Sequence, residues 1–178
     1  MITYHLDLSA ETFMFLFAVC VLLPALPTAL IHWKLQPIPV LAWSVVIGLS
    51  CLAGLFLCVE IWLSKITVSG RHIEIDGWRY RTAGEIRTHG VSAVSGTLQD
   101  HHLYRRNGLD LYSSKKGHYV LADGPVYLAA GSGALYQLLL TDGRRIWLSV
   151  PAAQETAWMT WLNQQELLSP AVGSDKQN

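Results

Sequence analysis

The adjacent residues Asp100–His102 (DHH) carry the side chains that most often bind metal ions or transfer protons. Zinc takes imidazole nitrogens and carboxylate oxygens, but a site needs three or four ligands brought together at defined spacings. The histidines His72, His89 and His118 are scattered along the chain and give no such spacing. The DHH cluster is therefore interpreted as the polar part of a loop, and neither a metal site nor a cofactor is predicted.

Motifs for nucleophilic catalysis are also missing from the sequence. Gly131–Gly133 (GSG) lacks the G-x-S-x-G spacing and the strand–turn–helix setting of a hydrolase. Phosphate-binding G-x-x-x-x-G-K and dinucleotide-binding G-x-G-x-x-G motifs are absent as well. The three cysteines, Cys20, Cys51 and Cys58, lie within apolar blocks and have no zinc-ligand spacing, so they are interpreted as small packing residues. We therefore expect a protein that is not an enzyme.

A basic pair next to a tyrosine is the best candidate for a contact with another protein. Tyr104, Arg105 and Arg106 lie in the long polar stretch 97–108, which is interpreted as a mobile loop. The alternative is that the two arginines only keep this loop soluble. The formal net charge of the chain is +0, and its basic residues are spread over different turns, which argues against nucleic-acid binding.

Three further basic residues suggest an alternative function in lipid recognition. Lys65, Arg79 and Arg81 could contact lipid headgroups, since each basic residue near an anionic surface contributes about 1 kcal/mol. The hairpin turn Ser69-Gly70 is too short to form a deep phosphate pocket. Alternation places both arginines on one face of a strand, and that face could also be plain solvent-exposed surface.

The elements that position these residues follow from a change in composition near residue 64. Residues 12–63 contain only two charged residues, Lys34 and Glu60. Phe13–Ile31 and Pro37–Val59 are charge-free runs of 19 and 23 residues, about 28 and 34 Å long as helices, against about 30 Å for a bilayer core. These lengths predict a transmembrane helical hairpin over 12–63; a buried helical pair in a soluble protein is the alternative.

The predicted hairpin has helices at about 12–32 and 40–63, after an N-terminal tail 1–11. A stripe of mostly small residues on the second helix predicts close helix packing, against the first helix or in a homodimer; it includes Ser44, Gly48, Cys51 and Cys58. Glu60, near the end of this helix, is expected to be solvated at the membrane interface. The basic residues that follow predict a multi-pass protein of the bacterial inner (plasma) membrane with both termini in the cytoplasm.

From residue 64 the hydrophobic period changes to two. Short alternating runs such as KITVS and HIEID, separated by turns, predict seven or eight antiparallel strands in a sandwich or small barrel. A closing amphipathic helix is expected after Pro151, with Trp158 and Trp161 on one face. The cytoplasmic β domain thus covers 64–168, and a disordered tail covers 169–178.

This order of elements resembles bacterial two-span membrane proteins with a pleckstrin-homology-like (PH-like) domain. The resemblance implies that Trp158 or Trp161 anchors the closing helix. The predicted function is to bind a protein partner at the membrane, as an immunity protein against a membrane-acting bacterial toxin or as an assembly factor. The alternative is a PH-like module that senses lipid headgroups. Membrane lipids, and a second copy of the chain through the second helix, are the further expected partners.

Overall fold

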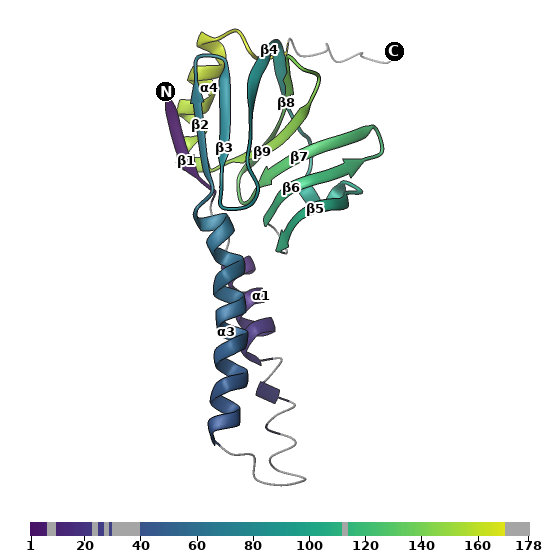
Figure 1. The fold of residues 1–178 in the computed structure, drawn as a ribbon. Helices are drawn as coiled ribbons and strands as arrows, with labels where there is room; N and C mark the ends of the chain where they lie inside the picture. Colours follow the sequence, from purple (N-terminus) through teal and green to yellow (C-terminus); the bar gives the residue numbers. More distant parts are fainter. Residues whose placement is uncertain (7–9, 23–24, 27–28, 30–39, 112–113, 170–178) are drawn as a thin grey trace.

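The computed structural model describes residues 1–6, 10–22, 25–26, 29, 40–111 and 114–169 (Figure 1). The main element of these residues is one mixed sheet of nine strands with the linear order β1-β2-β3-β4-β8-β9-β7-β6-β5. The strands are β1 (Ile2–His5), β2 (Lys65–Ser69), β3 (His72–Asp76), β4 (Thr82–Ala93), β5 (Tyr104–Leu111), β6 (Ser114–Leu121), β7 (Gly124–Ala130), β8 (Ala134–Leu140) and β9 (Arg145–Val150). A short 3-10 helix, η2 (Leu98–Asp100), precedes β5.

The alternating runs form strands because one side of each run is buried. In β2 and β3 the apolar side chains are fully buried while their neighbours face outward. The two strands pair in antiparallel register, with Ile66 opposite Ile75 and Val68 opposite Ile73. Gly70 in the connecting turn has φ of 56°, a left-handed conformation that glycine adopts without strain.

The predicted antiparallel sandwich or barrel is wrong. The sheet is mixed because β7 and β9 pair in parallel, with Tyr127 opposite Ile146. It also has more strands than expected, since Ile2–His5 pairs with β2 and the polar stretch before Gly108 contributes to β5. Strand order runs from β1 at one end to β5 at the other.

The C-terminal helix α4 (Ala152–Gln164) covers the core through its tryptophans. Trp158 is fully buried and its ring contacts those of Tyr4, Tyr136 and Trp161. Trp161 Nε1 donates a hydrogen bond of 3.0 Å to the carbonyl of Gly70, which ties the helix to the β2–β3 turn. Burying large aromatic side chains contributes strongly to the stability of a core.

Between β1 and β2 lie the helices α1 (Ala10–Phe17), the π-helical η1 (Ala18–Leu22) and α3 (Val40–Trp62). Together they form a helical arm that projects from the sheet (Figure 1). Its exposed large apolar side chains include Val45, Leu49, Leu52, Leu55 and Phe56 of α3.

The structure contradicts the predicted transmembrane hairpin. Where the first span was expected, over 12–32, the described helices are the eight residues of α1 and the five of η1. Even taken together, these 13 consecutive residues are about 20 Å long, short of a bilayer core of about 30 Å. Counted over the described residues, none of the helices combines the length and the apolarity that crossing a membrane requires. The predicted inner-membrane location, with both termini in the cytoplasm, depended on these spans and is therefore also wrong.

The small residues predicted to pack in the helical pair have different surroundings. Gly48 has no atom within 4 Å of the position its Cβ would occupy, and Cys51 is exposed. The exposed Ser44 lies on the same helix, whereas the side chain of Cys58 is outside the described set. The close approach occurs at Gly54, where a Cβ would lie 2.6 Å from Cys20 Sγ. The predicted disordered tail, apart from Ser169, is outside the described residues.

A buried ion pair joins the arm to the sheet. Lys116 of β6 donates hydrogen bonds to Glu60 Oε1 at 3.1 Å, Ser64 Oγ at 2.7 Å and the carbonyl of Asp76 at 2.9 Å. Lys116 is 0% exposed and Glu60 4%. Glu60 was expected to be solvated at a membrane interface, and this expectation is wrong because its side chain is buried.

The same carboxylate also holds the segment between β3 and β4. Glu60 accepts hydrogen bonds from the amides of Arg79 at 2.7 Å and Tyr80 at 3.1 Å. The end of α3, the β3–β4 connection and β6 are thus fixed to one another by a single network, here called the junction: Glu60, Ser64, Asp76, the Arg79 and Tyr80 amides, and Lys116.

The junction predicts unequal effects at two neighbouring lysines. Lys116→Met leaves the Glu60 carboxylate buried without its counter-charge and should lower the free energy of unfolding by about 3–5 kcal/mol. Lys115→Met removes only the ion pair with Asp110 at the edge of the sheet and should cost less than about 1 kcal/mol. Urea unfolding of both variants measures the difference. Equal losses would contradict a structural role of the junction.

Gly77 offers a second test, because its Cβ would enter the junction. A Cβ there would clash with Lys116 Nζ and lie 2.5 Å from Glu60 Oε1 and 2.9 Å from the Tyr80 carbonyl. Gly77→Ala should therefore destabilise the protein by about 1–3 kcal/mol. Gly48→Ala is the control; it enters open space in the middle of α3 and should stabilise by about 0.5–1 kcal/mol. Thermal unfolding of the two variants should move in opposite directions.

Candidate functional site

The junction contains a hydroxyl and an amine in hydrogen-bond contact, an arrangement that can serve nucleophilic catalysis. Burial lowers the pKa of Lys116, although its hydrogen bond to Glu60 acts in the opposite direction. A nucleophile must also reach a substrate, and both Ser64 and Lys116 are 0% exposed. The junction therefore holds the fold together, and the candidate site lies elsewhere.

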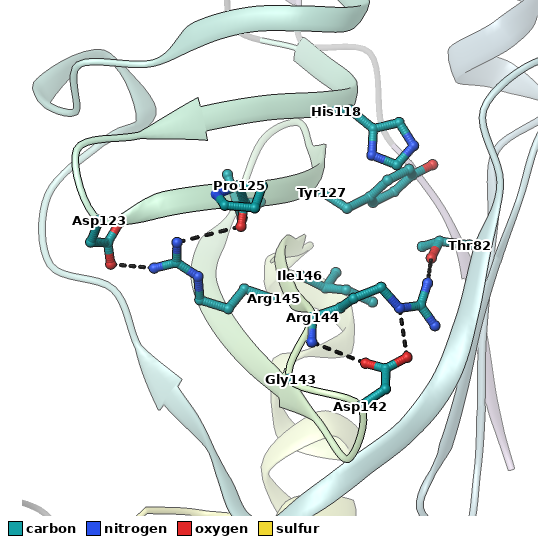
Figure 2. Close-up of a pocket in the computed structure, with 11 residues that line it drawn as sticks. Thr82, His118, Asp123, Pro125, Tyr127, Asp142, Gly143, Arg144, Arg145 and Ile146 are labelled. Atoms are coloured by element: carbon teal, nitrogen blue, oxygen red, sulfur yellow. Dashed lines mark hydrogen bonds and ion pairs between the residues drawn. The ribbon is translucent and has the colours of Figure 1, made fainter.

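A hollow of about 540 Å³ opens between the β6–β7 hairpin and the β8–β9 turn (Figure 2). It is lined by Thr82, His118, Asp123, Pro125, Val126, Tyr127, Asp142, Gly143, Arg144, Arg145 and Ile146. A second hollow of about 260 Å³ is lined by Arg106, Asn107, His118, Tyr119 and Pro125. The two hollows adjoin at His118 and Pro125 and are together called the groove; the smaller one reaches the edge strand β5.

Strand register explains why residues from distant parts of the sequence line this groove. Asn107 pairs with His118, His118 with Tyr127, and Tyr127 with Ile146. Residues paired across neighbouring strands place their side chains on the same face of a sheet. These four therefore form a row from β5 across β6 and β7 to β9. The rings of His118 and Tyr127 meet edge to face, with centroids 5.2 Å apart.

Two arginines hold the walls of the larger hollow (Figure 2). Arg144 donates to Asp142 Oδ2 at 2.6 Å, Thr82 Oγ1 at 3.1 Å and the carbonyl of Ala83 at 2.8 Å, so it joins the β8–β9 turn to β4. Hydrogen bonds from Arg144 lower the pKa of Asp142. Arg145 makes an ion pair with Asp123 in the β6–β7 turn. Each arginine in this wall thus has a carboxylate beside it.

Two basic residues of β5 have no acidic partner among the described residues. Asp110 forms an ion pair with Lys115 at 2.5 Å, as Asp123 and Asp142 do with the wall arginines. Arg105 and Arg106 form no ion pair with any described residue, and both are exposed. The excess positive charge of this half of the sheet is therefore concentrated at the start of its edge strand.

The structure brings together the three residues predicted to contact a partner, but on a strand instead of a mobile loop. Tyr104, Arg105 and Arg106 begin β5, and Tyr104 is 72% exposed. A bulge between Arg105 and Asn107 leaves Arg106 without a paired residue on β6. Such bulges redirect a side chain, and Arg106 lines the smaller hollow of the groove.

The lipid-headgroup candidates lie in β2 and in the β3–β4 connection. Lys65 is in β2, paired with Asp76, while Arg79 and Arg81 are exposed in the connection. Arg79 lines a hollow of only about 60 Å³ together with Phe56, Trp78 and Leu109 of β5. Lys65 and Arg81 do not line that hollow.

The DHH residues are used for local structure. The amide and hydroxyl of Thr97 donate to Asp100 and lower the pKa of its carboxyl group. His101 packs edge to face on Trp147 and contacts the carbonyl of Ser95 at 3.1 Å. Among the described residues, no group of three or more histidine, cysteine, aspartate or glutamate side chains could hold a metal ion.

Several groove residues escaped sequence reasoning. His118, Tyr127 and Arg144 belong to separate strands and turns, and nothing in their spacing relates them. The pair Arg144-Arg145 was visible only as a basic turn. A weak signal was the sequence Thr-Asp-Gly-Arg-Arg at 141–145, in which aspartate and arginine two residues apart can pair across a turn.

Tyr127 provides a test of the packing under the groove. Its hydroxyl is buried without a hydrogen-bond partner among the described residues, and burial raises the pKa of Tyr127. An unsatisfied buried polar group costs about 1–3 kcal/mol, so Tyr127→Phe should leave the protein as stable or raise its free energy of unfolding by about 1 kcal/mol. Urea unfolding checks this expectation. A clear loss of stability would reveal a hydrogen bond that the hydroxyl makes in solution.

Comparison with protein-family models, with curated proteins and with solved structures gives no match. The function proposed for this chain therefore rests on its own geometry and charges.

Proposed function

We propose that this chain is a non-enzymatic module that binds a protein partner at the start of β5 and along the adjoining groove. The observation that carries the proposal is the position of Tyr104, Arg105 and Arg106. They are exposed, they begin the terminal strand of the sheet, and the two arginines are without ion-pair partners among the described residues.

The residue types support this proposal. Tyrosine and arginine contribute a disproportionate share of the binding energy in protein interfaces. A terminal strand also offers backbone donors and acceptors to another chain, so that main-chain hydrogen bonds add to the side-chain contacts. The groove beside the strand can accept side chains of the partner next to Arg106 and His118.

Two classes of partner fit such a module: a bacterial toxin that the protein neutralises as an immunity protein, and a subunit of a complex that it helps to assemble. They differ in phenotype. Loss of the gene should make cells sensitive to toxin-bearing neighbours in the first case. In the second case it should reduce the amount of the assembled complex.

The site can be tested by photo-crosslinking in the native cell. A benzoylphenylalanine replacing Tyr104 should give one discrete covalent adduct after illumination. Combining it with Arg105→Glu and Arg106→Glu should reduce the yield at least fivefold, since reversing two exposed charges weakens an interface by about 1 kcal/mol or more. Adduct yield on denaturing gels, normalised to expression, is the measurement.

A matched control has the same change in charge elsewhere on the sheet. Arg79→Glu with Arg81→Glu should leave the adduct at position 104 unchanged. Loss of the adduct in this control, with no loss in the Arg105/Arg106 variant, would contradict the proposed site.

A further inference from the structure

We infer that the partner binds through an extended acidic segment, which adds to the sheet as a strand beside β5 and places carboxylates on Arg105 and Arg106. This inference rests on the proposed function and specifies the chemistry of the partner. Three considerations support it: the unmatched positive charge of Arg105 and Arg106, the geometry of β5, and the charges that a second copy of the chain would bring to the same edge.

The charge at this edge selects for acidic groups. Asp110, Asp123 and Asp142 are each matched by a basic residue of the same half of the sheet. Asp100, four residues before Tyr104, forms no ion pair among the described residues, but its carboxylate accepts hydrogen bonds from the amide and hydroxyl of Thr97. Arginine binds carboxylates with two parallel hydrogen bonds, which gives such a contact directional preference as well as charge.

The geometry of β5 suits the backbone of an added strand. After the bulge, pairing with β6 is regular from Asn107 to Leu111. These five residues span about 17 Å, enough for a short segment to form main-chain hydrogen bonds. The bulge lies at Arg106, at the end where the two arginines are exposed, so carboxylates there would flank the regular part of the ladder.

The most obvious competitor is a second copy of this chain. Two β5 strands paired edge to edge in antiparallel fashion would bring Arg105 and Arg106 of one copy towards the far end of the other strand, where the acidic residue is Asp110. That carboxylate is already matched by Lys115. An acidic segment offers carboxylates without such a partner and is therefore the better match for the two arginines.

The test uses the full chain and three fluorescent ten-residue peptides. The first alternates threonine and glutamate, the second alternates threonine and lysine, and the third is the acidic peptide N-methylated at every second residue. Fluorescence anisotropy at low and physiological salt gives the affinities. Hydrogen–deuterium exchange locates the bound peptide on the chain.

The acidic peptide should bind saturably and at least tenfold more tightly than the basic peptide, with affinity that falls as salt rises. It should also slow exchange of the amides in Tyr104–Leu111. N-methylation should weaken binding at least tenfold, because it removes main-chain donors. Arg105→Glu with Arg106→Glu should reverse the preference between the acidic and basic peptides, and Arg79→Glu with Arg81→Glu should leave it unchanged.

Equal binding of acidic and basic peptides, or a preference unaffected by reversing Arg105 and Arg106, would overturn the acidic partner. Undiminished binding of the N-methylated peptide would overturn strand addition. If none of the peptides binds while crosslinking from position 104 in the cell persists, the inferred chemistry is wrong and the proposed protein-binding function still stands. If that crosslink is also absent, both fail together.

Discussion

The arrangement of this molecule depends on one buried ion pair. Glu60 at the end of α3 and Lys116 of β6 are both removed from water, and a buried charge is tolerated only when its partners are present. The same carboxylate binds the amides after Gly77, so the helical arm, the β3–β4 connection and the β5–β7 strands are fixed by one network. Lys116 fixes β6 in place, and this also fixes the position of His118, which lies two residues further along the same strand.

The arginines of the groove and those of the edge strand have different roles. Arg144 and Arg145 are held by neighbouring carboxylates and connect separate turns, so they shape the walls. Arg105 and Arg106 have the same side chain but no ion pair among the described residues, which leaves their charge available to a partner. Residue type alone does not distinguish these roles; the distribution of aspartates around each arginine does.

The alternation of apolar and polar residues located several strands, but it did not show which strands are neighbours in the sheet. The alternation in 65–76 corresponds to β2 and β3, because one face of each strand is buried. Alternation does not state which strand lies beside which, so the parallel pairing of β7 with β9 was missed. The first part of β5, up to Gly108, was taken for a loop because its residues are mostly polar and show no period of two; the first four are all exposed in the structure. The charge-free run 13–31 predicted one α-helix, because its composition is uniformly apolar. In the structure the α-helix α1 ends at Phe17, and η1 follows it as a π-helix. The pairing of Glu60 with Lys116 joins residues too distant in sequence for spacing to reveal.

The position of β1 has a consequence for how the chain reaches this fold. Ile2 lies opposite Val68, so the first strand finds its place only after the whole helical arm and β2 have been synthesised. Strand β4 likewise waits for β8, with three other strands made in between. Pairing strands that are far apart in the sequence costs loop-closure entropy before any stabilising contact forms. Such pairings therefore slow folding. On the ribosome β1 to β3 can pair early, whereas the connection of β4 to β8 forms only near the end of synthesis, so the sheet is completed late.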